Sequence, residues 1–188
     1  MRKVCRMLLH LTFAIIPVLC LTVTASNALF CALAVFLALM LSCAVRITPA
    51  KIIPEQAKNF VIIIAVALGI SIVELFSAGK LNSDIAAAAF MPLCAVPALL
   101  LLGETSAEKG AKATFIKALI TGGLYTALLV AIGAIRELIG SGCIFGLNVT
   151  RSLFDPIKVL AMPAGAIFVI ALFIAVLKHI AKEDEADA

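Results

Sequence analysis

Two cysteines lie beside prolines in apolar stretches of the sequence, where thiols can serve as metal ligands. Cys20 lies three residues after Pro17, and Cys94 lies three residues before Pro97. A proline inside an apolar helix removes a backbone hydrogen bond and leaves carbonyl oxygens without their helical partners. If the two interrupted helices meet, this mirror-like placement brings two sulfur ligands together. The alternative is that both cysteines are small apolar fillers beside ordinary helix kinks.

Three charged residues are candidates for an ion path. Glu74 lies about one helical turn from the end of an apolar stretch. A carboxylate at membrane depth is costly, so it suggests cation contact or proton relay, unless it simply reaches the interface. Arg136 and Glu137 follow directly on another apolar run. Adjacent residues on a helix point in different directions, so these two could anchor the helix end, order the following loop or line an ion path.

The composition places these residues in an integral membrane protein. The chain has 188 residues, of which 64% are hydrophobic and only 14% charged, and its mean hydropathy is +1.20. Soluble domains have about 45–50% apolar and about 25% charged residues. A soluble fold of this size could not cover the excess apolar surface. A soluble enzyme, a disordered chain and a nucleic-acid-binding module are therefore excluded. Most of the six cysteines lie in apolar stretches, which argues against a disulfide framework.

Six stretches are long and apolar enough to cross a bilayer, for which about 20 mostly apolar residues are needed. They cover residues 7–23, 28–45, 59–78, 85–102, 114–135 and 159–180. With the N-terminus inside, eleven of the fifteen Lys and Arg residues fall on the inner side. Positive residues resist translocation, so both termini are predicted to be cytoplasmic.

A cleaved signal peptide is the alternative interpretation of the first 27 residues, which have a basic start and an apolar core. Pro17 interrupts that apolar stretch, which is also longer than usual for a signal peptide. A lipoprotein-type cleavage before Cys20 requires a small preceding residue, and Leu19 is not small. The sequence therefore favours a retained first span.

The interrupted spans occupy corresponding positions in two halves of the chain. Pro17 lies in the first span, and Pro92 and Pro97 lie in the fourth. Because each half has three spans, the second half must enter the membrane from the opposite side. Paired broken helices in inverted repeats meet near the midplane and form sites. We expect an all-α membrane protein with six transmembrane helices, the first helix of each repeat being broken. Its predicted parts are a single domain over 1–188, repeats over about 7–78 and 85–180, and a solvated acidic tail over 182–188.

Several segments of the chain resemble a known family. They are Val23–Leu29 (VTASNAL), Phe90–Leu93 (FMPL), Leu102–Glu104 (LGE) and Ile135–Gly142 (IRELIGSG), the last followed by Phe145–Gly146. With six spans and a cytoplasmic N-terminus, the chain resembles the Rnf/Nqr membrane-subunit family, on the branch that contains the E component of Rnf and the D component of Nqr. The resemblance covers nearly the whole chain, and the IRELIGSG segment is its most specific part.

The resemblance implies a subunit of a redox-driven pump in the bacterial cytoplasmic (inner) membrane. Such complexes pass electrons between ferredoxin or NADH, flavins and an acceptor, and they move Na⁺ or H⁺. In the family, two cysteines from this subunit and two from an inverted homologous partner bind one intramembrane [2Fe–2S] cluster, so that four thiolates complete it. One chain would then hold half a site and would not be catalytic alone. Other subunits of the complex and the lipid bilayer are the implied partners.

The sequence departs from the family at the cysteines. The family's first cysteine directly precedes a proline, where this chain has Ile16, and the second falls near Pro97 and Ala98. Cys20 and Cys94 are each displaced by about one helical turn, roughly 5 Å along a helix axis. Displacement by one turn preserves the helix face, so we expect Cys20 and Cys94 to be shifted cluster ligands. The alternatives are a cluster-free structural or assembly homologue, and a secondary transporter built from inverted repeats.

Overall fold

A computed structural model describes residues 11–22, 24–48, 54–77, 84–105, 110–144, 147–148, 165, 167–172 and 174–175. The chain is helical over residues 11–15 and continues as a short 3₁₀ helix, η1 (Ile16–Cys20). Four long helices follow, α2 (Ala25–Ile47), α3 (Glu55–Ser77), α4 (Asp84–Thr105) and α5 (Ala111–Ser141). Two short strands, β1 (Cys143–Ile144) and β2 (Leu147–Asn148), pair antiparallel directly after α5.

The all-α architecture predicted from the sequence is confirmed, and the second to fifth expected spans coincide with α2 to α5. Three described helices, at Ala25–Ile47, Gln56–Phe76 and Ala111–Gly140, are long and apolar enough to cross a membrane. A shorter apolar segment, Pro92–Gly103, lies within α4. The described part of the expected sixth span is helical at residues 165, 167–172 and 174–175, and the rest of that span and the tail lie outside the described residues.

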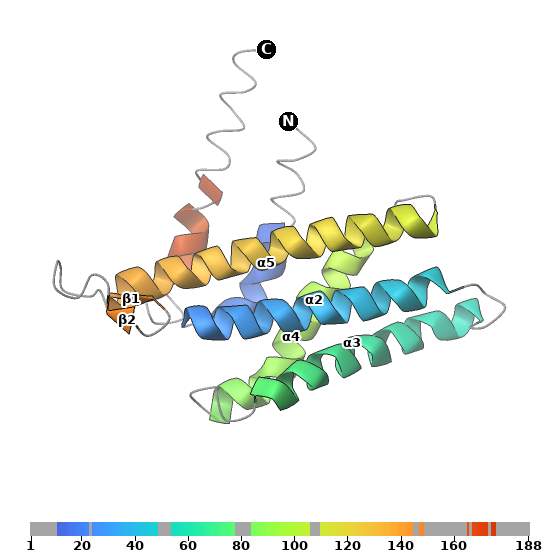
Figure 1. Ribbon diagram of the computed structural model, residues 1–188, viewed down its shortest axis with the longest axis horizontal. Coiled ribbons are helices and arrows are strands. Elements are labelled where there is room, and N and C mark those ends of the chain that lie inside the picture. Colours follow the sequence, from blue (N-terminus) through green and yellow to red (C-terminus); the bar gives the residue numbers. More distant parts are fainter. Residues whose placement is uncertain are drawn as a thin grey trace, which may run out of the picture.

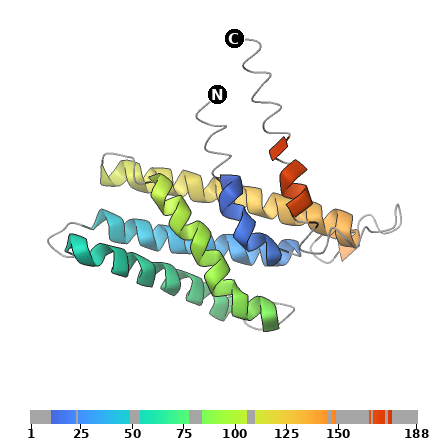
Figure 2. The ribbon, with the colours of Figure 1, turned by 180° about the vertical axis from the view of Figure 1, so that it is seen from behind.

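The helices form a layer with two further elements across one face of it. Helices α5, α2 and α3 run side by side, with α2 in the middle (Figure 1). Viewed from behind, α4 and the first helical segment lie across this layer (Figure 2). Helix α4 contacts η1 as well as all three layer helices. The initial segments of the two halves of the chain thus share one face of the molecule.

The two proline-containing segments differ from each other. Around Pro17 the chain leaves α-helical geometry and forms η1, as expected for an interrupted helix. Helix α4 instead continues through both Pro92 and Pro97. The prediction that the fourth span is broken is therefore wrong. Each proline removes one backbone donor, and packed transmembrane helices tolerate this because neighbouring groups can take up the freed carbonyl oxygens. Pro97 is buried, whereas Pro92 faces outward.

Small residues set the close spacing of the layer. A Cβ atom added to Gly133 of α5 would lie 2.5 Å from the Cβ of Ala28 in α2. On the other side of α2, a Cβ on Gly69 of α3 would lie 2.8 Å from the Cα of Ala38. Both distances are shorter than a carbon–carbon contact allows. Small residues at such crossings let membrane helices approach closely.

The outer surface of α3 is strongly apolar. Phe60, Leu75 and Phe76 each expose more than two thirds of their surface. Other large apolar side chains on this helix are also exposed, namely Ile63, Ile64, Leu68 and Ile72. Exposed apolar patches of this extent are typical of surfaces that contact lipid or another protein. The surface agrees with the membrane assignment made from composition.

Candidate functional site

A buried arginine holds the turn between η1 and α2. Nη1 of Arg136 donates hydrogen bonds to the carbonyl oxygens of Leu19 at 2.8 Å and Thr22 at 2.7 Å. It also lies 2.9 Å from Oγ1 of Thr22. Arg136 is completely buried although it carries a charge. Carbonyl oxygens at the end of a helix have no helical partner, and a cation is favoured there.

Glu137 binds the N-terminal end of α2, which follows the same turn. Its Oε2 accepts a hydrogen bond from the backbone N–H of Ala25, the first residue of α2, at 2.7 Å. Thr24 is the N-cap of α2, and its hydroxyl oxygen accepts from the N–H of Asn27 at 3.2 Å. Two of the first N–H groups of α2 therefore have side-chain partners. A carboxylate is favoured at this position because the N-terminus of a helix carries partial positive charge.

Arg136 and Glu137 lie on a helix that is longer than the sequence indicated. The fifth apolar stretch was predicted to end at residue 135, but α5 continues to Ser141. It ends at Gly142, which adopts a left-handed conformation (φ 70°) and donates its N–H to the carbonyl oxygen of Leu138. The two charged side chains thus face the η1–α2 turn from a rigid helix. Their proposed role in an ion path stays a prediction, and the hydrogen bonds give them an anchoring role.

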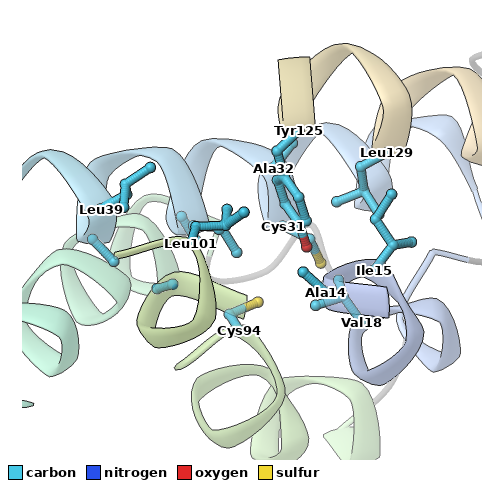
Figure 3. Close-up of a cluster of buried hydrophobic side chains, with 14 of the residues drawn as sticks. Ala14, Ile15, Val18, Cys31, Ala32, Leu39, Cys94, Leu101, Tyr125 and Leu129 are labelled. Atoms are coloured by element: carbon cyan, nitrogen blue, oxygen red, sulfur yellow. The ribbon is translucent and has the colours of Figure 1, made fainter. Parts of the chain in front are cut away.

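A pair of thiols lies in the middle of the fold. Cys31 of α2 and Cys94 of α4 are both buried free cysteines. Figure 3 shows both sulfur atoms directed into the space between α2, α4 and the first helical segment. Cys94 lies near the middle of α4, and Cys31 lies in the second turn of α2. The contact brings together residues 63 positions apart in the sequence.

A tyrosine from a third helix completes this group. Tyr125, near the middle of α5, is completely buried, and its hydroxyl has no hydrogen-bond partner among the described residues. Figure 3 shows its hydroxyl oxygen directed toward the sulfur of Cys31. A buried hydroxyl without a partner costs about 1–3 kcal/mol. We refer to Cys31, Cys94 and Tyr125 as the thiol–tyrosine site.

Apolar side chains from four elements enclose the thiol–tyrosine site. The first helical segment contributes Ala14, Ile15 and Val18, and α5 contributes Leu129 (Figure 3). Ala32 of α2 and Leu101 of α4 belong to the same buried group. In such surroundings an uncompensated charge is strongly disfavoured. The site therefore favours chemistry in which the thiols and the hydroxyl stay neutral overall.

The predicted pairing of Cys20 with Cys94 is not tested by the described residues and stays a prediction. Cys94 is buried in the core of the fold. Cys20 ends η1, but its side chain lies outside the described residues. The neighbour that the structure gives Cys94 is Cys31, a residue that the sequence pattern had not singled out. No proline lies beside Cys31, and only the packing of α2 against α4 reveals the pair.

Glu74 lies on α3, a helix that contacts α4, and its side chain is half-buried. Within the part of the chain that the structure describes, no three His, Cys, Asp or Glu side chains gather at one point. The role of Glu74 in an ion path stays a prediction.

These features define a class of protein: an α-helical membrane protein whose interrupted first segment is fixed by buried charges beside a buried pair of thiols. Residues 4–174 match the model of the family described as Rnf-Nqr subunit, membrane protein. The chain therefore belongs to the Rnf-Nqr family, and the resemblance predicted from its motifs is confirmed.

Curated relatives agree with this membership. The chain is 28% identical over 170 residues to the E component of the Na(+)-translocating ferredoxin:NAD(+) oxidoreductase complex of Acetobacterium woodii, covering 89% of this chain and 87% of that protein. It is 36% identical over 91 residues to the E component of the proton-translocating ferredoxin:NAD(+) oxidoreductase complex of Clostridium ljungdahlii, covering 47% and 43% of the two chains. It is also 36% identical over 69 residues to the D component of the Na(+)-translocating NADH-quinone reductase of Pseudoalteromonas translucida, covering 34% and 32%.

Proposed function

We propose that this chain is a membrane subunit of a redox-driven, ion-translocating complex of the Rnf/Nqr type, in which electron transfer is coupled to Na⁺ or H⁺ movement. The observation that carries the proposal is the family match over residues 4–174 together with the relative similar over 89% of the chain. That relative and the two others are named as subunits of complexes that translocate Na⁺ or protons. Partners are therefore other subunits of such a complex, including an inverted homologue of this chain.

The η1–α2 turn supports this proposal because it gives the first segment a fixed interruption. Arg136 and Glu137 neutralise the two helix ends that face the turn, so the polar backbone is satisfied inside an apolar fold. Interrupted helices of this kind form ion or substrate sites in transporters with inverted repeats. We propose the same six-span inverted arrangement here, with both termini on the cytoplasmic side of the bacterial inner membrane.

The [2Fe–2S] cluster predicted for Cys20 and Cys94 stays a prediction. A cluster completed by a partner subunit needs thiolates that face the boundary between the two chains. Cys94 is 0% exposed, its described neighbour is the thiol of Cys31, and apolar side chains of this chain enclose both. These surroundings do not fit a cluster shared with a partner, and they favour the second candidate, a homologue that keeps the fold without the cluster.

Purification in mild detergent tests the proposed function. An affinity-tagged chain expressed in its own membrane is expected to retain other Rnf/Nqr-type subunits, whereas an unrelated tagged membrane protein from the same cells should not. Purification of the chain alone, with ion-dependent solute uptake after reconstitution in liposomes, would contradict the proposal and favour a secondary transporter.

Iron and labile sulfide in the purified complex test the cluster separately. If Cys20 and Cys94 are ligands, Cys20→Ser and Cys94→Ser should each abolish the paramagnetic signal of the reduced cluster. Cys43→Ser is the matched control, because Cys43 is buried at another place, where its thiol contacts the carbonyl oxygen of Thr114. An unchanged spectrum in both variants would remove these two cysteines from the cluster.

A further inference from the structure

We propose that Cys31 and Cys94 form a redox-active dithiol that converts reversibly to a disulfide inside the fold, with Tyr125 assisting the reaction. Two buried thiols from different helices are directed into one apolar space, and a completely buried tyrosine hydroxyl without a described partner is directed toward the sulfur of Cys31. The proposal rests on the proposed function only for the source and destination of the electrons.

The apolar enclosure determines which redox chemistry fits the site. Both thiols lie among aliphatic side chains of the first segment, α2, α4 and α5. Two thiolates, or a metal held by them with a net charge, would place uncompensated charge in these surroundings at a high cost. A dithiol and a disulfide are both neutral. The couple therefore changes its oxidation state in an apolar interior without changing its charge.

The reaction balances with a two-electron acceptor such as a quinone or an oxidised flavin. The S–H bonds of Cys31 and Cys94 break and one S–S bond forms, which releases two protons and two electrons. A quinone takes up the two protons and the two electrons, and its two carbonyl oxygens become hydroxyl groups. The reverse reaction consumes a hydroquinone or a reduced flavin. In the proposed complex, a carrier of this chemical class in another subunit would exchange electrons with the pair.

Tyr125 has a role at the intermediate stage of this reaction. When one thiol has lost its proton and the S–S bond has not yet formed, one sulfur carries negative charge. The hydroxyl of Tyr125 has a donor that no described residue uses, and it is directed toward this position. A hydrogen bond to a charged acceptor is stronger than one between neutral groups. Tyr125 is thus expected to stabilise the sulfur anion and to act as a positioning residue for it.

Burial separates the thiol pair from soluble thiols. Exchange with glutathione requires direct attack by a thiolate on a sulfur atom, and access controls its rate. Cys31 is 1% exposed and Cys94 is 0% exposed. The oxidised pair should therefore resist reduction by soluble thiols.

The experiment uses the complete chain in its own membranes. Membranes are incubated with a tetramethyl-substituted benzoquinone, whose ring positions are all blocked against addition of thiols, or with the corresponding hydroquinone. They are then denatured in SDS with a maleimide, and the peptides are identified by mass spectrometry. After quinone treatment, we expect Cys31 and Cys94 in one disulfide-linked peptide pair. After hydroquinone treatment, both should carry maleimide. Cys43 should carry maleimide in both samples, since its described partner is a carbonyl oxygen.

Variants separate the role of each residue. Tyr125→Phe keeps the ring and is expected to slow disulfide formation by about tenfold, because it removes one hydrogen bond to a charged sulfur. Co-purification of partner subunits with this variant shows that it folds. Maleimide on both Cys31 and Cys94 after full quinone oxidation would overturn the proposal. So would stoichiometric metal that disappears in both Cys31→Ser and Cys94→Ser. Neither result depends on whether the chain assembles into an ion-translocating complex.

Discussion

The carboxylate of Glu137 accepts a hydrogen bond from the backbone N–H of Ala25, with 2.7 Å between Oε2 and N. Ala25 begins α2, and Glu137 lies near the end of α5. The bond joins two positions 112 residues apart. Since the first N–H groups of a helix have no partner within it, this bond connects the start of α2 to α5 and fixes the direction in which the chain leaves η1.

Replacing Glu137 should destabilise the chain in proportion to the hydrogen bond that is lost. Glu137→Ala leaves the buried N–H of Ala25 without its described acceptor, so we expect a loss of about 1–3 kcal/mol. Glu137→Gln keeps an acceptor oxygen at the same length and removes only the charge. Its loss should be smaller, about 1 kcal/mol. The melting temperature of the protein in mild detergent measures both effects.

Lys112→Ala is the control for Glu137. Lys112 is an exposed charged residue in the first turn of the same helix. Its replacement should leave the melting temperature nearly unchanged, because isolated exposed charges contribute little. Equal melting temperatures for the wild type and Glu137→Ala would show that the bond to Ala25 does not stabilise the fold.

Arg136 should be less tolerant of replacement than Glu137. One guanidinium nitrogen of Arg136 contacts both Leu19 and Thr22, and the side chain is completely buried. In Arg136→Lys the charge is kept, but the planar group that donates in several directions is lost. We expect a loss of about 1–2 kcal/mol for Lys, and of about 3 kcal/mol or more for Ala, which leaves two buried carbonyl oxygens without this donor.

Limited proteolysis and melting in detergent check the Arg136 prediction. Loss of the guanidinium should expose the η1–α2 turn, so cleavage between residues 18 and 25 should become faster in Arg136→Ala than in the wild type. Lys112→Ala again serves as the exposed control. If Arg136→Lys proves as stable as the wild type, the directional hydrogen bonds to Leu19 and Thr22 are not what holds the turn.

The helices could be predicted from sequence because apolar length alone defines a membrane span. Residues 28–45 and 59–78 were expected as spans, and α2 and α3 cover nearly the same ranges. Helix ends were harder to predict. Arg136 and Glu137 ended the fifth apolar run, yet α5 continues through both. Their charges are compensated by a turn more than 100 residues away, and apolar periodicity carries no information about such a contact.

Of the thiol–tyrosine site, only Cys94 could be predicted from the sequence. The prolines directed attention to Cys94, which lies at the centre of the fold. They did not indicate Cys31, because its importance comes from the crossing of α2 and α4. Tyr125 also gave no signal, since a lone tyrosine in an apolar helix is a common core residue. A pair contributed by two helices requires the distance between those helices, and hydropathy does not supply it.

The contact between α5 and α2 predicts a strong contrast between two glycines of the same helix. A Cβ on Gly133 would lie 2.5 Å from the Cβ of Ala28, whereas a Cβ on Gly123 meets nothing within 4 Å. Gly133→Ala must therefore separate the helices near the η1–α2 turn, at a cost of about 1–3 kcal/mol. Gly123→Ala should be neutral or slightly stabilising, since alanine favours helix over glycine.

Melting of the two glycine variants in the same detergent checks this contrast. Both substitutions add one methyl group to α5, so propensity and composition change equally. Only the space around the added group differs. Equal melting temperatures for the two variants would mean that α5 and α2 are not packed as closely as Gly133 and Ala28 indicate.

Glu74 is the remaining candidate for an ion path, and its position supports a direct test. Its side chain is half-buried near the C-terminal end of α3. A cation crossing an apolar layer is stabilised by a carboxylate at that depth. Glu74→Gln keeps the shape and removes the charge, so ion uptake by the reconstituted complex should slow by about tenfold, which corresponds to about 1.4 kcal/mol.

Ser71→Ala, an exposed polar position one turn earlier in α3, is the matched control and should pump at the wild-type rate. Measuring electron transfer in the same liposomes separates slower pumping from slower redox chemistry, and full ion uptake by Glu74→Gln would remove Glu74 from the path.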